Sequence, residues 1–231
     1  MIVVIGSPTG RLTDGAISAG GAAARVALAA AGAGRPVQLV GKTGDDATAD
    51  GVVLDLARGG VGNVALLRDP ARATPLEPPA DPDERDGLED SEVSGTATAT
   101  GTANEAPPPA APTAPAGPSL EAADVDLGLR YLTDFAVIVL AEPALDEVVR
   151  IVAEAARWGE ARLVLVVRSG ERAPAGLPPD AVVLEAPASD PDGAFASLVG
   201  TFAAALDGGT EPGEAFRTSI VADGWTVAAD D

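Results

Sequence analysis

The 231-residue chain contains 46% hydrophobic residues but only 3% aromatic ones, and it has neither Cys nor His. A sequence without these two residue types excludes disulfide bonds, thiol nucleophiles, Ser-His-Asp triads and imidazole metal sites. The formal net charge of −20 argues against nucleic acid or an anionic membrane as a partner, because both are bound through Lys and Arg. Any general base must therefore be Asp, Glu or Lys, and any metal an oxygen-liganded ion such as magnesium.

The sequence pattern of residues 1–73 predicts alternating strands and helices, as in a parallel sheet covered by helices. The opening MIVVIG is an apolar strand without the basic region of a signal peptide, and no stretch reaches the roughly 18 apolar residues of a membrane span. We therefore expect a cytoplasmic protein. The elements predicted here are strands at 2–5, 37–40 and 64–67 and helices at 20–31 and 46–58.

Residues 74–120 differ sharply in composition from the rest of the chain. They hold half of its 20 prolines, an acidic run at 81–92 and a Gly/Thr/Ala repeat at 95–102. Such a segment buries too little apolar surface to offset the entropy lost on ordering. The sequence predicts a disordered acidic and Pro-rich linker that interrupts one α/β domain.

Residues 121–231 return to the strand and helix pattern and predict the C-terminal part of the same domain. Small and branched apolar residues dominate, which suits helices packed closely on a parallel sheet. Segment 144–158 is amphipathic, with Leu145, Val148, Val149 and Val152 on one helical face. The predicted elements are strands at 136–140, 163–167 and 181–184 and helices at 144–158, 192–206 and 212–221.

A glycine pair, Gly20-Gly21, opens the first predicted helix, and the next strand ends in Gly-Lys-Thr-Gly-Asp-Asp from Gly41. With Gly60-Val61 further on, this arrangement resembles the N-terminal signature of the ribokinase/PfkB carbohydrate kinases. The resemblance implies a three-layer α/β fold whose mostly parallel sheet has helices on both faces, with the family's lid replaced here by the disordered insertion. It also implies that Gly20, Gly21 and Gly41 bind substrate.

The position four residues after the second glycine, where the family typically has a substrate-binding Asn, is Arg25. A guanidinium is charged and only donates hydrogen bonds, so it favours an anionic ligand over a sugar hydroxyl. Two alternatives stay open at this helix start. The glycine pair either admits a ligand to free backbone amides or makes a tight turn, and Arg25 either contacts that ligand or faces solvent.

The second family signature is a glycine-rich turn that forms an anion hole and ends in a catalytic Asp. The corresponding segment reads Ala-Pro-Ala-Ser-Asp-Pro-Asp-Gly from Ala186. The resemblance assigns Asp192 as the catalytic base and Ser189 and Gly193 as phosphate or nucleotide contacts. However, the preceding glycines are missing, and Asp190 and Pro191 oppose an anion by charge and by loss of an amide. The alternative is that Asp190 or Asp192 caps the following helix.

Two other motifs have simpler interpretations. Gly41-Lys42-Thr43 is not a P-loop, because the position where a P-loop needs its first glycine is Pro36. Asp45-Asp46 precedes a predicted helix, where a carboxylate accepts hydrogen bonds from free amides, so we favour capping over metal binding.

We find no counterpart of the family's N-x-x-E or T-x-G-x-x-G motifs. We therefore expect a degenerate kinase, a pseudokinase, that binds a sugar or nucleoside-like molecule with weak or no phosphoryl transfer. An active minimal kinase that uses ATP, Mg and Asp192, and a non-catalytic interaction protein, are the alternatives. Without an evident lid, through which the family often dimerises, we expect a monomer.

Overall fold

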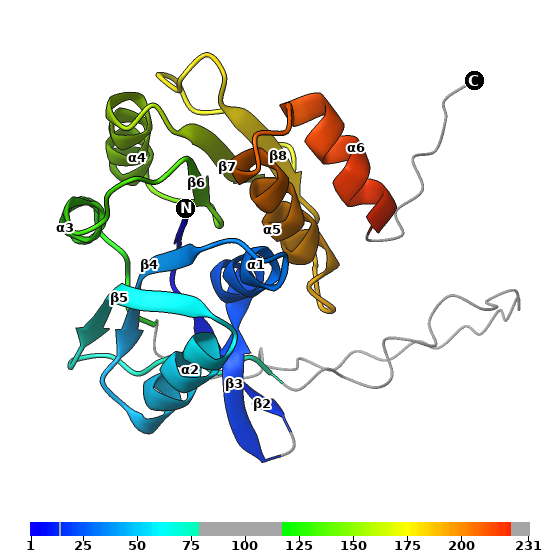
Figure 1. Cartoon of the computed structure of the whole chain (residues 1–231). Coiled ribbons are helices and arrows are strands. Elements are labelled where there is room, and N and C mark those ends of the chain that lie inside the picture. The colour runs from blue at the N-terminus through cyan, green and yellow to red at the C-terminus, as the bar shows by residue number, and fades with distance from the viewer. Residues whose placement is uncertain (14, 79–116, 223–231) are drawn as a thin grey trace, which may run out of the picture.

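The computed structural model describes residues 1–13, 15–78 and 117–222 (Figure 1). Its centre is a six-stranded sheet in the order β5-β4-β1-β6-β7-β8, and every neighbouring pair runs parallel. This confirms the predicted α/β class. The strands are β1 (Ile2–Ile5), β4 (Val37–Gly44), β5 (Val61–Asp69), β6 (Val137–Leu140), β7 (Arg162–Arg168) and β8 (Val182–Ala186).

The helices cover both faces of the sheet, which gives the three layers predicted from the sequence. Alternation along β1 divides the core, because Ile2 and Val4 pack on one face while Val3 and Ile5 pack on the other. The first face is covered by α1 (Gly21–Gly32), α2 (Ala47–Arg58), α5 (Ala194–Asp207) and α6 (Pro212–Ala222). The second is covered by α3 (Ala122–Arg130) and α4 (Asp146–Trp158). None of the described helices has the length and hydropathy required to cross a bilayer.

Helices α1 and α5 approach closely because their facing side chains are small. Ala23, Ala27 and Ala30 of α1 are fully buried. On α5, a Cβ atom placed on Gly200 would lie 2.5 Å from the carbonyl oxygen of Val26. This close contact sets the N-terminal ends of the two helices beside each other at one edge of the sheet.

The sequence analysis missed two features, a hairpin and the helix α3. Strands β2 (Thr9–Thr13) and β3 (Ala16–Gly20) pair antiparallel in a separate two-stranded sheet, which projects from the body of the molecule in Figure 1. The hairpin contains Gly10, Arg11 and Ser18 rather than a run of β-branched residues, so it carried no strand signal. The short α3 was obscured by the predicted linker next to it.

Most of that linker, residues 79–116, lies outside the described residues. Its two ends are described and contact the domain. Thr74 is 5% exposed, and its amide donates to a carboxylate oxygen of Asp46 at 2.7 Å. Leu76 forms a parallel bridge with Gly10 of the hairpin, and Leu120 packs against the core beneath α3 and α4.

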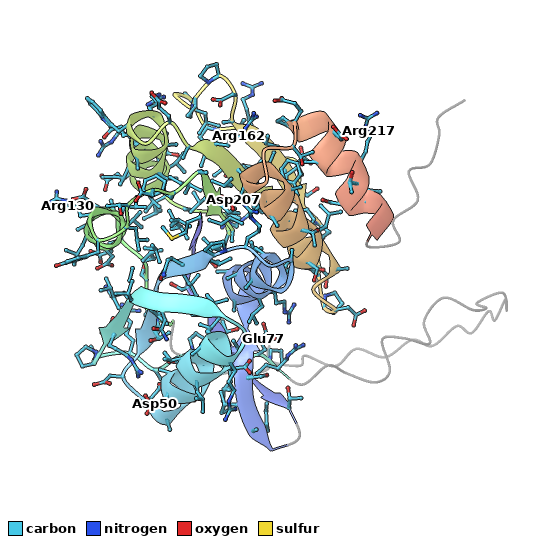
Figure 2. All side chains as sticks on the ribbon, viewed as in Figure 1. Asp50, Glu77, Arg130, Arg162, Asp207 and Arg217 are labelled. Atoms are coloured by element: carbon cyan, nitrogen blue, oxygen red, sulfur yellow. The ribbon has the colours of Figure 1, made fainter. Side chains whose placement is uncertain are left out.

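One buried carboxylate ties the end of α5 to the start of the sheet. The Asp207 side chain is 2% exposed, and it accepts a 2.9 Å hydrogen bond from the amine of Met1 and a 2.6 Å bond from Nε of Arg35. Burial alone would raise the pKa of Asp207, but these two cations outweigh it and hold the pKa below its usual value. Figure 2 places Asp207 in the interior of this view, whereas Arg130 and Arg217 lie at the margin.

Replacing Asp207 with Asn should lower the free energy of unfolding by about 3–5 kcal/mol, because two cations lose their buried partner. The pKa of Asp207 is depressed, so the stability it supplies is present above about pH 4 and is lost as the pH falls through the folded-state pKa. Urea unfolding at pH 6 and pH 3.5 measures both effects. As the control, Glu211→Gln removes an exposed ion pair with Arg162 and should cost at most about 1 kcal/mol. Equal losses in the two variants would contradict this assignment.

Candidate functional site

The candidate site lies at the carboxyl ends of the central strands. The chain passes from β1 through α1 to β4 on one side of β1, and later returns to β6 on the other side. In open α/β sheets ligands bind in the crevice where the strand order reverses in this way. Gly6 and Ser7 follow β1 at this point, and Glu142 follows β6.

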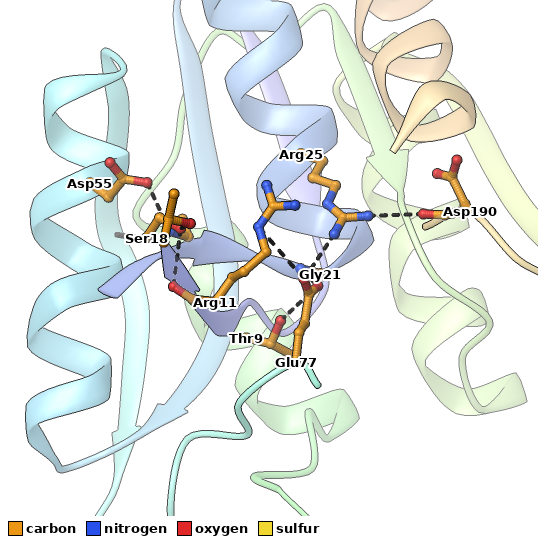
Figure 3. A network of polar contacts seen from close by, with 10 residues as sticks. Thr9, Arg11, Ser18, Gly21, Arg25, Asp55, Glu77 and Asp190 are labelled. Atoms are coloured by element: carbon orange, nitrogen blue, oxygen red, sulfur yellow. Dashed lines mark hydrogen bonds and ion pairs between the residues drawn. The ribbon is translucent and has the colours of Figure 1, made fainter. Parts of the chain in front are cut away.

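The glycine pair lies against a carboxylate of the protein itself (Figure 3). The amide of Gly21 donates to Oε1 of Glu77 at 2.6 Å, and Thr9 Oγ1 donates to the same oxygen at 3.2 Å. A Cβ atom on Gly20 would lie 2.8 Å from Cδ of Glu77, so a side chain there would exclude the carboxylate. Gly21 has φ +81°, which favours glycine. The pair therefore does admit an acidic group to the start of α1, and in this structure that group is Glu77.

Arg25 connects this carboxylate to the turn before α5. One of its terminal nitrogens donates to Oε2 of Glu77 at 2.8 Å, and the other donates to the carbonyl of Asp190 at 3.0 Å. Figure 3 shows the guanidinium between the two residues. The Arg25 side chain is only 17% exposed, so it is not a solvated helix residue. The structure thus brings together Gly20, Gly21, Arg25 and the turn at 189–193.

The same turn places a second internal carboxylate on the start of α5. Oδ1 of Asp190 accepts from the amide of Phe195 at 3.0 Å and Oδ2 accepts from the amide of Ala196 at 3.1 Å. Gly193 is the N-cap residue of α5 and has no side chain to cap it, so the Asp190 carboxylate, three residues earlier, accepts from the helix amides instead. Ser189 and Asp192 are exposed, and Gly193 is buried in a left-handed conformation with φ +73°. A Cβ atom on Gly193 would lie 2.7 Å from Cδ of Arg25, so this glycine makes room for the arginine.

The amides at the start of α5 do not fit the phosphates of ATP in this arrangement. An anion hole needs unpaired donors directed at the developing charge, whereas two of these amides already bind Asp190. The described residues also contain no group of three acidic, His or Cys side chains arranged to hold a metal ion.

Gly41, the remaining predicted substrate residue, lies buried within β4. A Cβ atom there would come within 2.3 Å of the carbonyl oxygen of Gly6. Because Gly41 has no side chain, the backbone after β1 can pass close to β4. The role that these contacts give Gly41 is therefore packing.

Asp46 caps α2, as expected from the sequence. Oδ1 accepts from the amide of Ala49 at 2.8 Å, and Oδ2 accepts from the amide of Thr74. Burial raises the pKa of Asp46, but these backbone hydrogen bonds outweigh it and the net shift is downward. Asp45 faces solvent and forms a 3.8 Å ion pair with Arg68.

A cleft of about 420 Å³ lies near the network, since its lining residues Ser7 and Pro75 are close in the chain to Thr9 and Glu77. Ser7, Pro75, Ser119, Glu142, Leu145 and Arg168 are among its lining residues. Glu142 accepts from the amide of Ser7 at 2.7 Å. Its burial raises the pKa, against the smaller opposing effect of this hydrogen bond. The hydroxyl of Ser7 is buried and has no partner among the described residues. The cleft thus combines a small-molecule volume with a few convergent polar groups.

Sequence reasoning missed both Glu77 and Glu142. Glu142 had a detectable signal, because it is an acidic residue two positions beyond the buried run Val137–Leu140, at the edge where parallel sheets bind ligands. Glu77 had none, since it stood inside the predicted linker, and only the tertiary fold brings it to Gly21.

Comparison with solved structures shows which fold this is. The chain is similar to the ribokinase of Arabidopsis thaliana, solved with ribose and ATP, at a TM-score of 0.60 and 16% identity over 96% of this chain and 90% of the other. A putative ribokinase II from E. coli has a TM-score of 0.57 and 13% identity, over 94% of this chain and 90% of the other. A putative ribokinase from Agrobacterium tumefaciens has a TM-score of 0.50 and 18% identity, over 96% of this chain and 89% of the other. No protein-family model matches the sequence, and no curated protein matches it either. The chain therefore has the ribokinase-like α/β fold.

The raised pKa of Glu142 makes a specific prediction about pH. An unfolded Glu titrates near pH 4.5, and between that pH and the higher folded-state pKa the native protein binds more protons, so this group lowers stability as the pH rises. Glu142→Gln should remove that loss, which can reach about 1.4 kcal/mol per pH unit. Urea unfolding at intervals from pH 4.5 to 7.5 tests this. If the curves of the two proteins stay parallel across this range, the carboxyl of Glu142 is not perturbed.

Proposed function

We propose that this protein is a degenerate member of the ribokinase/PfkB carbohydrate kinases, which binds a sugar or nucleoside-like molecule and transfers phosphate weakly or not at all. One observation supports the proposed loss of phosphoryl transfer. The amides of Phe195 and Ala196, which open α5, are bonded to Asp190 instead of being open to a phosphoryl group. Displacing the carboxylate would leave Asp190 itself beside the incoming anion and oppose binding by like charge.

The retained binding is supported by the cleft at the sheet edge. Its volume of about 420 Å³ falls within the range of small-molecule sites. The Glu142 carboxylate and the unpartnered Ser7 hydroxyl suit the hydroxyl groups of a sugar, which both donate and accept. The fold neighbour from Arabidopsis was solved with ribose, which gives the same ligand class as a starting point.

The second candidate is an active minimal kinase that uses ATP and Mg. The observation in its favour is the position of Asp192, which is exposed beside Gly193 at the start of α5. A base there could reach a substrate that lies between Arg25 and this turn. This candidate requires Asp190 to leave the helix amides, since they cannot bind both groups at once.

One set of assays separates the two candidates. Calorimetry with ribose, other pentoses, hexoses and nucleosides should show saturable binding of at least one of them, and Glu142→Gln should weaken that binding about tenfold by replacing the carboxyl group that bonds the ligand. A coupled assay with Mg and ATP on the ligand that binds should show turnover far below the roughly 1–100 per second of ordinary kinases.

Asp192→Asn is the decisive variant in the coupled assay. The proposal predicts no change in the residual rate, because Asp192 transfers no proton in a degenerate protein. Turnover at ordinary kinase rates in the wild type, abolished in Asp192→Asn while the variant stays folded, would establish the active kinase instead. Absence of binding to any sugar or nucleoside would contradict the proposed ligand class.

A further inference from the structure

The environment of Glu77 is that of a bound anion rather than of a surface side chain. Four groups from two elements, β2 and α1, converge on its carboxylate. Gly21 N and Thr9 Oγ1 approach one oxygen, while Arg25 lies 2.8 Å and Arg11 3.9 Å from the other. Two of the four are cationic. The side chain is 20% exposed, so the carboxylate is largely withdrawn from water.

The donors are held in place independently of Glu77. Gly21 opens α1, whose buried alanines pack against the sheet and α5. Thr9 is fixed by the β2–β3 pairing with Gly20. Arg25 is held by the carbonyl of Asp190 and by the space at Gly193. Among the described residues its Nε is buried and has no acceptor, so the guanidinium retains unused capacity to donate.

Glu77 itself is held by a short stretch of chain. Two backbone hydrogen bonds, from Gly10 N to the Pro75 carbonyl at 2.8 Å and from Glu77 N to the Gly10 carbonyl at 2.8 Å, attach residues 75–77 to the hairpin. Leu76, between them, is 55% exposed. Little apolar surface is therefore buried by this stretch, and its release costs less than release of a core element.

We propose that Thr9, Gly21 and Arg25, with Arg11 nearby, form a binding site for the carboxylate or phosphate group of a small molecule, and that Glu77 occupies this site as an internal ligand. The inference rests on the proposed small-molecule binding and specifies its ligand class. An incoming anion displaces the Glu77 side chain, and its remaining atoms extend towards the cleft that Ser7 and Pro75 line. A neutral ligand is a poor replacement for Glu77 there, because it would leave the largely buried Arg25 without a counter-charge.

The internal ligand lowers the apparent affinity for free anions, since the binding-competent state is only fractionally populated. Removing the carboxylate should therefore raise that affinity. Glu77→Ala should unfold at a lower temperature than the wild type, because Arg25 loses its partner. Inorganic phosphate or acetate, added at constant ionic strength, should restore its melting temperature in a saturable way, with an affinity at least tenfold higher than for the wild type. Acetamide, which is neutral, should have no effect.

Three variants complete the test. Glu77→Ala combined with Arg25→Gln should lose the response to both anions. Glu211→Ala removes a carboxylate that is paired with Arg162 at 3.4 Å on the surface, and it should gain no anion affinity. If Glu77→Ala does not fold, Glu77→Gln takes its place and should bind phosphate more tightly than the wild type by calorimetry.

The outcomes of these titrations distinguish between ligand classes. A preference for phosphate assigns a phosphorylated ligand, and a preference for acetate assigns a carboxylic acid. Equal anion affinity in the wild type and the Glu77 variants, or a response that survives Arg25→Gln, would overturn the inference. That result would leave sugar binding at the cleft untouched if calorimetry detects it. Conversely, anion rescue without any sugar or nucleoside binding would support the anion site and contradict the proposed neutral part of the ligand.

Discussion

The contact of Arg25 with Glu77 is the interaction on which the character of the site depends. Through one guanidinium it joins α1 to Glu77 and to the turn before α5. A charge that is largely withdrawn from water needs a partner or it destabilises the fold. Because this partner is supplied by the chain itself, the place where a ligand would meet the helix is filled in the free protein.

At both helix starts on this edge of the sheet, a carboxylate of the protein itself accepts hydrogen bonds from the first backbone amides. Backbone amides there attract anions whether these belong to a ligand or to the protein. At α1 the acceptor is Glu77, and at α5 it is Asp190. The ribokinase-like fold is thus present while internal carboxylates accept hydrogen bonds from the backbone amides at both helix starts. Closely packed alanines and Gly200 preserve the geometry of the edge independently of any chemistry there.

The sequence predicted the parts of this architecture that have strong local signals. Buried apolar runs such as Val137–Leu140 and the amphipathic segment at α4 specify strands and helices by themselves. The cap at Asp46 was predictable for the same reason, because it acts over three residues. The hairpin was not, since it lacks a run of strand-forming residues and packs against α2, which follows it in the chain. Glu77 lies 52 residues from Arg25, and no local pattern encodes that approach.

Calorimetric titration of the folded wild-type protein with ATP and magnesium tests the central claim most directly. If Asp190 occupies the amides at the start of α5, the titration should show no saturable heat up to millimolar nucleotide, while the melting transition confirms an intact fold. Saturable one-to-one binding at millimolar affinity or better would show that the amides or another part of the site accept the phosphates. It would contradict the claim that the chain's own carboxylates occupy the helix amides of this ribokinase-like fold.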